Sequence, residues 1–359
     1  MRFKGRFTKA LLVALILTLI PVTAFSAQKI TPGTTCKVYK QKITNQNKVY
    51  TCIKSGKKLV WNKGVQTPVP KKTPPPFQDD VSVKIDLIRN DAMKRTLTDS
   101  STHIFIFQDG ATQEVEFKTK RSLLNAVPIY NKLGFNTTDS LILVAKDMNW
   151  LKKELVNNEC FNPNPTPDRP GFYFGGKTCK KGNGAVTSYH WEKEKFSDGL
   201  DGLYFNHVIP HEYFHQIQQQ LTSYRGGEYP KWFWEGSAQF FTNQAWTTWN
   251  PQRSYLEWYQ HWWSDLRPDL GPTACKNVTI DHMSDPSNAG MANACAYSKG
   301  QLIVEYLVSK YGLEKYRSLY TSNMDPDWRN FKNVFKQVTG EELSDFYEEA
   351  QEFITKRGW

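Results

Sequence analysis

The chain lacks three features that would each assign it to a known class. It has no pair of cysteines separated by two residues, which excludes the common zinc-finger arrangements. It has no internal repeat, which excludes a solenoid or a propeller. Its one long apolar run, at residues 10–20, is shorter than the roughly 20 residues that a membrane-spanning helix needs. With 359 residues, of which 39% are hydrophobic and 14% aromatic, the chain can still fill a globular core.

The N-terminus has the features of an export signal. A basic start of four residues precedes the apolar run, and Pro21 leads into the small-residue stretch VTAFSA, with cleavage sites after Ala24 or Ser26. A retained membrane anchor is the competing interpretation, but the short run and Pro21 favour cleavage. No cysteine lies near these sites, which argues against a lipid anchor. We therefore predict a signal peptide over residues 1–27 and a mature chain that is secreted or associated with the cell surface.

The cysteines are consistent with this compartment. They form three near-neighbour couples, Cys36 with Cys52, Cys160 with Cys179 and Cys275 with Cys295. Other connectivities are possible, but pairing each cysteine with its neighbour keeps every loop short and every bridge within one region. Because disulfides persist in oxidising compartments, we predict three bridges in an extracytoplasmic protein.

The net charge of +11 is unevenly distributed along the chain. The first 27 residues carry four positive charges, and residues 28–77 carry eleven lysines and no acidic residue, which leaves −4 for residues 78–359. The basic character is therefore confined to the N-terminal region and does not indicate nucleic-acid binding. It suggests attraction to an anionic surface, such as an anionic polymer of the cell envelope, although a lysine-rich face that only maintains solubility explains the composition equally well.

Three regions follow the signal peptide. Residues 28–65 have the pattern of two or three short strands stapled by Cys36 and Cys52, and the ending YTCIKSGKKLVWNKG resembles small modules at the N-termini of secreted bacterial proteins. Residues 66–79 are rich in proline, which favours an extended spacer. Residues 80–359 form the main domain.

The main domain begins with alternating elements and becomes mainly helical after about residue 202. Residues 102–108, 140–147 and 184–190 have strand character, residues 119–133 are helical in pattern, and residues 160–179 are predicted to form a disulfide-closed loop. This order predicts an α+β fold in which a small mixed-sheet half precedes a helical half, with a cleft between them.

The stretch HEYFH at residues 211–215 is the strongest chemical signal. On a helix, His211 and His215 project from the same face and can share one metal ion, while Glu212 can reach a metal-bound water. The alternative is a helix with two surface histidines. Catalytic zinc takes three protein ligands, so a third ligand decides between the two interpretations.

Glu235, in the second helical segment YPKWFWEGSAQFF, completes a pattern that resembles the gluzincins. These zinc peptidases carry H-E-x-x-H on one helix and a glutamate ligand on the next. The resemblance extends weakly over residues 100–355, including the predicted helices at 296–320 and 339–354. It implies a zincin-like fold, Zn²⁺ as cofactor, ligands His211, His215 and Glu235, and Glu212 as the catalytic base. A downstream tyrosine assists the transition state in this family, and Tyr297 is the position that corresponds to it.

Three details leave alternatives open. Because of Pro210, the motif helix either starts there, with Pro at its first position, or is a longer helix from Asp201 that is kinked at that point. On an unbroken helix, His207 is an alternative ligand. His282 is an alternative to Tyr297 for stabilising the oxyanion.

The sequence therefore predicts a monomeric, secreted, zinc-dependent peptidase that acts on peptide or protein substrates. The G-x-M-E-N segment of aminopeptidase-type gluzincins is missing, so an endopeptidase is expected. Two alternatives are a catalytically retired gluzincin scaffold that binds a surface, and a zinc hydrolase of non-peptide amides.

Overall fold

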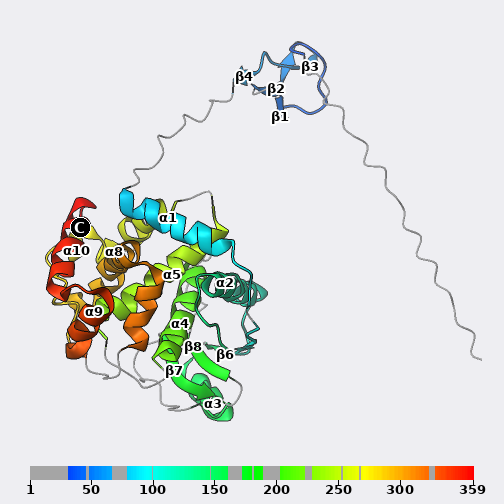
Figure 1. Cartoon of the computed structure of the whole chain (residues 1–359). Coiled ribbons are helices and arrows are strands. Elements are labelled where there is room, and N and C mark those ends of the chain that lie inside the picture. The colour runs from blue at the N-terminus through cyan, green and yellow to red at the C-terminus, as the bar shows by residue number, and fades with distance from the viewer. Residues whose placement is uncertain are drawn as a thin grey trace, which may run out of the picture. The chain divides into compact units, whose positions relative to one another are not determined.

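The structure is a computed structural model, and it describes residues 31–45, 48–66, 79–98, 100–145, 147–160, 172–179, 182–188, 203–222, 229–251, 254–266, 268–322 and 328–359. The chain divides into two compact units, Met1–Pro74 and Pro75–Trp359 (Figure 1). Their boundary falls within the proline-rich segment predicted as a spacer. The predicted signal peptide and residues 67–78 of that spacer lie outside the described residues.

The first unit is a small antiparallel sheet. Strand β2 (Lys48–Ser55) pairs with β1 (Lys42–Asn45) on one side and with β3 (Lys58–Trp61) and β4 (Val65–Gln66) on the other. One face of the sheet packs on the Cys36–Cys52 disulfide, where Tyr50 and Trp61 are also buried. Because few residues form this core, the disulfide contributes much of what holds the unit together.

The second unit contains a four-stranded mixed sheet with helices on both faces. Its order is β5-β6-β8-β7, formed by strands β5 (His103–Phe107), β6 (Ser140–Ala145), β8 (Gly182–Ser188) and β7 (Phe172–Cys179). The first three strands run parallel, and β7 is antiparallel to β8. Alternate residues of β6 face opposite sides of the sheet. Ile142 and Val144 join the main core, whereas Leu141 and Leu143 pack with helix α3 (Met148–Asn157).

Helices make up most of the second unit, with the strands and α3 at one end and the C-terminal helices at the other (Figure 1). The longer helices of the main core are α1 (Asp80–Met93), α2 (Gln113–Lys132), α4 (Leu203–Leu221), α5 (Lys231–Trp249), α8 (Met291–Thr321), α9 (Phe331–Thr339) and α10 (Leu343–Lys356). Shorter helical segments connect α5 to α8 and α8 to α9: α6 (Tyr255–Gln260), a π-helix (His261–Leu266), two 3₁₀ turns (Pro268–Leu270 and Trp328–Asn330) and α7 (Pro272–Cys275).

The predicted α+β class is confirmed, with two local differences. Helix α2 begins six residues before the predicted start because the Thr112 hydroxyl accepts a hydrogen bond from the Val115 N–H and caps the helix there. The prediction that residues 160–179 are all loop was wrong, since Phe172–Cys179 pairs with β8. The glycines in that segment concealed a strand whose partner begins at Gly182, which pairs with Cys179.

All three predicted disulfides are present, at Cys36–Cys52, Cys160–Cys179 and Cys275–Cys295. This pattern is typical of an extracytoplasmic protein. Among the described helices, none has the length and apolar character required to cross a membrane.

Helices α5 and α8 cross at a glycine–glycine contact. A Cβ atom added at Gly236 would lie 2.3 Å from the carbonyl carbon of Gly300, and one added at Gly300 would lie 2.8 Å from the Trp232 carbonyl oxygen. These separations are too short for real carbon atoms, so the two backbones approach as closely as they do only because both residues lack a side chain. Glu235 precedes one of these glycines, and Tyr297 lies one helical turn before the other.

We expect Gly236→Ala to destabilise the protein by about 1–3 kcal/mol, because the added methyl group must push two packed backbones apart. Chemical denaturation monitored by tryptophan fluorescence measures the change as a lower midpoint. Thr248→Ala, at a half-buried position near the end of the same helix, serves as the control and should shift the midpoint much less. Equal midpoints for the two variants would mean that the helices can separate at no cost.

Candidate metal centre

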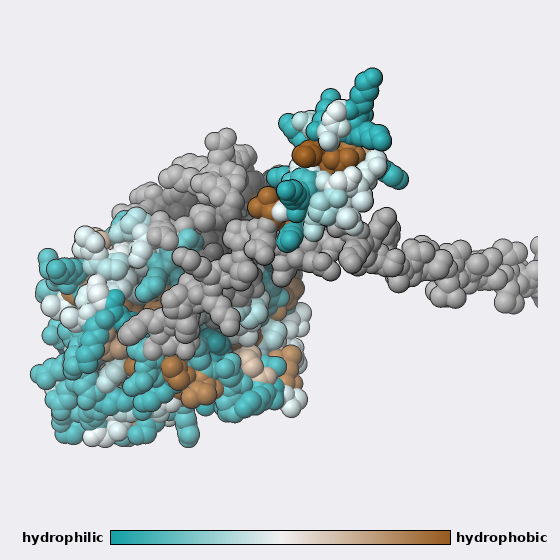
Figure 2. Space-filling view, turned by 90° about the horizontal axis from the view of Figure 1, so that it is seen from above, coloured by the Kyte–Doolittle hydropathy of each residue, from teal (hydrophilic) through white to brown (hydrophobic). Residues whose placement is uncertain are grey.

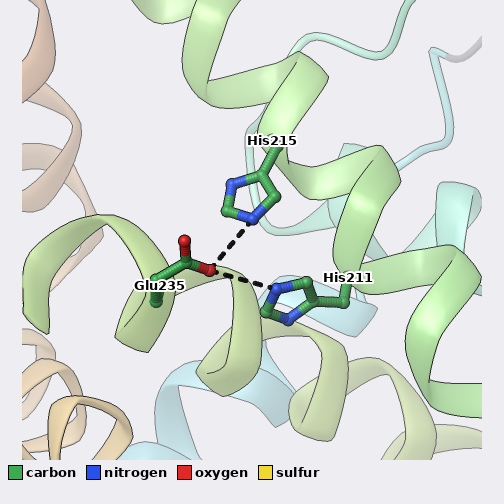
Figure 3. A group of neighbouring side chains, drawn as sticks. All are labelled: His211, His215 and Glu235. Carbon is green, nitrogen blue, oxygen red and sulfur yellow. Dashed lines mark ion pairs between the residues drawn. The ribbon is translucent and has the colours of Figure 1, made fainter. Parts of the chain in front are cut away.

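Three buried side chains from two helices converge on one point (Figure 3). His211 and His215 extend from successive turns of α4, and Glu235 faces them from α5. The Oε2 atom of Glu235 lies 3.4 Å from Nε2 of His211 and 3.2 Å from Nε2 of His215. One ligand atom from each residue lies within 4.8 Å of the others. The cluster could therefore hold a metal ion.

Helix α4 is continuous through Pro210, from Leu203 to Leu221. Of the two arrangements that the sequence left open, the structure therefore has the longer helix, and it continues through the proline. Proline lacks an N–H, so one hydrogen bond of the helix is lost at this point. The Pro210 carbonyl accepts a hydrogen bond from the Tyr130 hydroxyl on α2 at 3.1 Å, which ties the start of the motif to the sheet side of the unit.

Gln218 fixes the orientation of the His215 ring. Its amide nitrogen donates to the Trp234 carbonyl and to the Tyr320 hydroxyl, both at 2.8 Å. Its oxygen is therefore the acceptor for Nδ1 of His215, 2.6 Å away. With the proton on Nδ1, the Nε2 atom that faces Glu235 is the one that can bind a metal.

Lys231 holds the other oxygen of the glutamate. Its ammonium lies 2.9 Å from Oε1 of Glu235, one turn away on α5, so that Oε2 alone faces the histidines. Burial by itself would raise the pKa of Glu235, but His215, His211 and Lys231 outweigh that effect and hold the pKa well below its usual range. The carboxylate is therefore ionised at neutral pH.

Gln218 and Lys231 were not singled out from the sequence. Each lies one helical turn from a predicted ligand, Gln218 three residues after His215 and Lys231 four residues before Glu235. This spacing places side chains together on one helix face and is the signal that could have identified them.

Glu212 lies beside the cluster, half-buried on α4. Burial raises the pKa of its carboxyl group, and the nearby histidines only partly offset the effect. A carboxyl group whose pKa is raised in this way is suited to accepting a proton and returning it during a reaction.

Tyr297 borders the cluster from α8. Its ring stacks on that of His211, with centroids 5.8 Å apart and planes inclined by 21°. The charge of Glu235, together with burial, raises the pKa of the Tyr297 hydroxyl well above its usual value. The hydroxyl therefore keeps its proton and can donate a hydrogen bond, and Glu235 is one group that accepts from it here.

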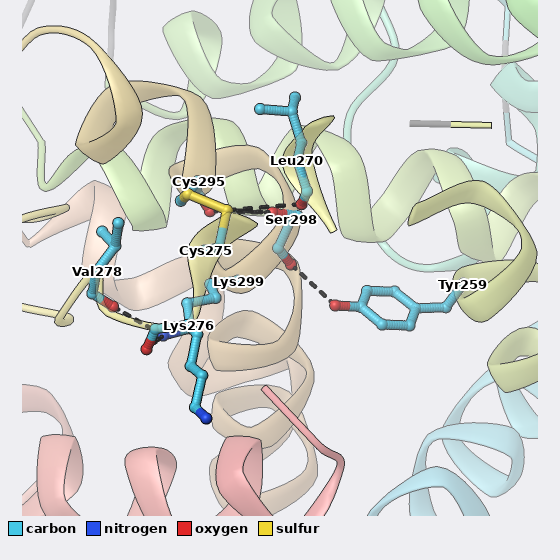
Figure 4. Close-up of a disulfide and its surroundings, with 8 residues drawn as sticks. All are labelled: Tyr259, Leu270, Cys275, Lys276, Val278, Cys295, Ser298 and Lys299. Atoms are coloured by element: carbon cyan, nitrogen blue, oxygen red, sulfur yellow. Dashed lines mark hydrogen bonds between the residues drawn. A yellow bond between two sulfur atoms is a disulfide. The ribbon is translucent and has the colours of Figure 1, made fainter. Parts of the chain in front are cut away.

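The Cys275–Cys295 disulfide anchors the part of α8 that carries Tyr297 (Figure 4). Cys295 lies two residues before the tyrosine. Nearby, Lys299 donates to the Val278 carbonyl at 2.7 Å, and the Tyr259 hydroxyl donates to the Ser298 carbonyl at 3.3 Å. These contacts on both sides of Tyr297 restrict the position of its helix.

The two alternative histidines are placed differently. His207 lies one turn before His211, but its ring stacks on Trp262 at 4.4 Å, and burial lowers its pKa to about 3. The group of potential ligands among the described residues does not include it. His282 is exposed, and the hydrogen bonds of its backbone are to Thr279 and Asn288 in its own loop. Among these candidates, it is therefore Glu235 that lies with His211 and His215, and Tyr297 whose ring contacts His211.

Comparisons with protein-family models, with curated proteins and with solved structures find no match to this chain. Its function is therefore inferred from the geometry and the chemistry of the site.

Proposed function

We propose that this protein is a secreted zinc-dependent peptidase of the gluzincin type and that it acts as an endopeptidase. The observation that carries the proposal is the convergence of His211, His215 and Glu235 in a buried cluster, with Glu212 and Tyr297 beside it. Surface histidines on an ordinary helix would not face a buried carboxylate.

The ligand set supports zinc as the metal. Two imidazoles and one carboxylate are a common ligand set of catalytic zinc. Ligand atoms of a tetrahedral zinc ion, bound at about 2.0–2.1 Å, lie about 3.3 Å from each other. The separations of 3.4 and 3.2 Å between Glu235 Oε2 and the two histidine nitrogens match that value.

The reaction requires a base and a hydrogen-bond donor as well as a metal. His211, His215 and Glu235 would hold a zinc ion, which when bound would supply the Lewis acidity to activate water near neutral pH and to polarise a peptide carbonyl. Glu212 accepts the proton of the attacking water and then delivers it to the leaving amine. Tyr297 donates a hydrogen bond to the carbonyl oxygen as negative charge develops there. Lys231 and Gln218 keep Glu235 and His215 in position throughout.

Zinc content tests the assignment of the ligands. We expect about one zinc ion per purified chain, lost on His211→Ala and on Glu235→Ala, because two remaining ligands bind zinc weakly. Elemental analysis by mass spectrometry after dialysis gives the stoichiometry. Glu314→Ala, at an exposed position on α8, is the matched control and should keep its zinc. A Glu235→Ala protein with unchanged zinc affinity would show that the third ligand is another residue.

Tyr297→Phe tests the proposed donor. We expect kcat to fall by roughly 10²- to 10³-fold with little change in KM or zinc content, because a donor that acts on the developing charge contributes mainly to the transition state. Tyr306→Phe, farther along the same helix, removes a hydroxyl that donates to Glu349 and should leave kcat unchanged. An unaffected rate in Tyr297→Phe would assign this side chain to packing alone.

Digestion of a mixture of peptides, with and without a chelator, distinguishes the proposed peptidase from its alternatives. Cleavage within peptides that the chelator abolishes supports the endopeptidase. Zinc binding without any hydrolysis would indicate a retired scaffold, and hydrolysis of simple amides without peptide cleavage would indicate a different zinc hydrolase.

A further inference from the structure

One face of the N-terminal sheet carries a group of mainly apolar residues, two of which are exposed to solvent. Register places Val49, Thr51 and Ile53 of β2 on the same side of the sheet, with Val65 opposite Val49 and Val60 opposite Ile53. The other side carries the buried residues of the disulfide core. On the open side, Val65 is 68% exposed and Ile53 is 41% exposed, while Val49, Thr51 and Val60 are half-buried. We call these five residues the open face.

The composition of the open face is unusual for a solvated surface. A sheet with one face in water normally places polar residues there, because the apolar residues gain by facing the core. Here β-branched residues occupy the central positions. No described residue covers Val65 or Ile53, as their exposure shows. Figure 2 shows hydrophobic residues exposed among hydrophilic ones on this small unit.

Lysines border the open face and surround the unit. Lys42 is paired with Thr51, and Lys58 is paired with Ser55, so both lie at the margin of this side. Residues 31–66 contain eight lysines and no acidic residue. Seven of these lysines are exposed: Lys37, Lys40, Lys42, Lys54, Lys57, Lys58 and Lys63. The partner that complements this charge is anionic.

We propose that the open face docks on the surface of an anionic phospholipid bilayer. A soluble polyanion would satisfy the lysines but would leave Ile53 and Val65 in water. A bilayer surface can bind both the lysines and the apolar residues. Its acidic head groups attract the lysines, and its interfacial region accepts short apolar side chains. The inference does not depend on the peptidase activity of the second unit.

Co-sedimentation with lipid vesicles tests the proposal. The protein is the chain from residue 28 onward, so that the apolar run at residues 10–20 contributes to no measurement. The vesicles contain phosphatidylglycerol and phosphatidylcholine in equal parts, or phosphatidylcholine alone. We expect the partition coefficient to be at least tenfold higher for the anionic vesicles, and to fall at high salt.

Two double variants separate the contributions. Lys42→Gln with Lys58→Gln should lower the partition coefficient by roughly 25-fold, which is about fivefold per lysine. Ile53→Ser with Val65→Ser should lower it by about tenfold without changing the charge. The matched control is Lys153→Gln with Val156→Ser on α3 of the second unit, where Val156 is 60% exposed, and it should bind as the unchanged chain does. An intact Cys36–Cys52 bridge in each variant verifies that the unit is folded.

Three results would overturn the proposal. Equal binding of the Ile53→Ser, Val65→Ser variant and the unchanged chain would show that the open face does not contact lipid. Binding to soluble polyphosphate that is stronger than binding to vesicles and indifferent to these two substitutions would identify an anionic polymer as the partner. Binding to neither would mean that the lysines serve solubility.

Discussion

Replacing Glu212 by glutamine is expected to lower kcat for peptide hydrolysis by roughly 10²- to 10⁴-fold, the range for loss of a general base. Glutamine keeps the shape of the side chain but cannot accept the proton of the attacking water. Because Glu212 is not among the three clustered ligands, zinc content should remain at about one ion per chain. Single-turnover kinetics on a peptide substrate, together with elemental analysis, measures both quantities.

The combination of retained zinc and lost activity is the informative result. Loss of zinc together with activity would mean that Glu212 supports the metal rather than the chemistry. Retention of most of the activity would transfer the role of base to another group and would contradict the proposed mechanism. Glu314→Gln provides the control for replacing an exposed carboxylate by an amide elsewhere in the same unit.

Arg357→Met is expected to have the largest effect on folding. The guanidinium group is buried and forms paired hydrogen bonds with two carboxylates. It donates to Asp79, the cap of α1, at 2.7 and 2.9 Å, and to Glu305 in the middle of α8 at 2.7 and 2.8 Å. One side chain thus joins the first helix of the unit, its longest helix and its C-terminus.

We expect Arg357→Met to lower the free energy of unfolding by about 3–5 kcal/mol at pH 7, the range for removal of one partner from a buried ion pair. The cost arises because Glu305, which is fully buried, loses its compensating cation. The denaturation midpoint in guanidinium chloride measures it. Lys356→Met is a close control, since Lys356 pairs with Glu352 on the surface, where such pairs contribute about 0–1 kcal/mol.

The effect of Arg357→Met should depend on pH. Burial raises the pKa of Glu305 even with Arg357 present, and the pKa will rise further once the cation is gone. Protonation of Glu305 then removes the uncompensated charge. The difference in free energy of unfolding between Arg357→Met and the unchanged protein should therefore shrink as the pH falls toward 5. Glu305→Gln added to Arg357→Met should recover part of the stability at pH 7. Equal midpoints for Arg357→Met and Lys356→Met would show that the buried pair contributes nothing.

In the unchanged protein, Asp79 makes a contribution to the free energy of unfolding that depends on pH in the acid range. Burial alone would raise its pKa, but the hydrogen bonds from Arg357 and from the Ser82 N–H lower it below the ordinary value. A carboxyl group with a lowered pKa stabilises the folded state above its unfolded pKa of about 3.9 and loses that effect as the pH falls through the folded value. The pH dependence of stability below about pH 4 should therefore be weaker in Arg357→Met.

Local patterns in the sequence were sufficient for several features of this protein. The spacing of His211 and His215 depends only on the geometry of one helix, and the pairing of neighbouring cysteines only on short loops. The strand character of residues 102–108 and 140–147 follows from runs of β-branched and aromatic residues. These features could be predicted from the sequence because each depends on contacts between residues that are close in the chain.

The tertiary structure alone decided the rest, because the remaining features depend on residues far apart in the sequence. The sequence could name Glu235 and Tyr297 only through a family resemblance, whereas the contact between Gly236 and Gly300 brings their helices together at the cluster. The strand at Phe172–Cys179 was missed because it forms by pairing with β8, not by its own propensity. The orientation of His215 by Gln218 likewise requires Tyr320, 102 residues farther along the chain. Packing between distant segments, which no local pattern encodes, determines these contacts.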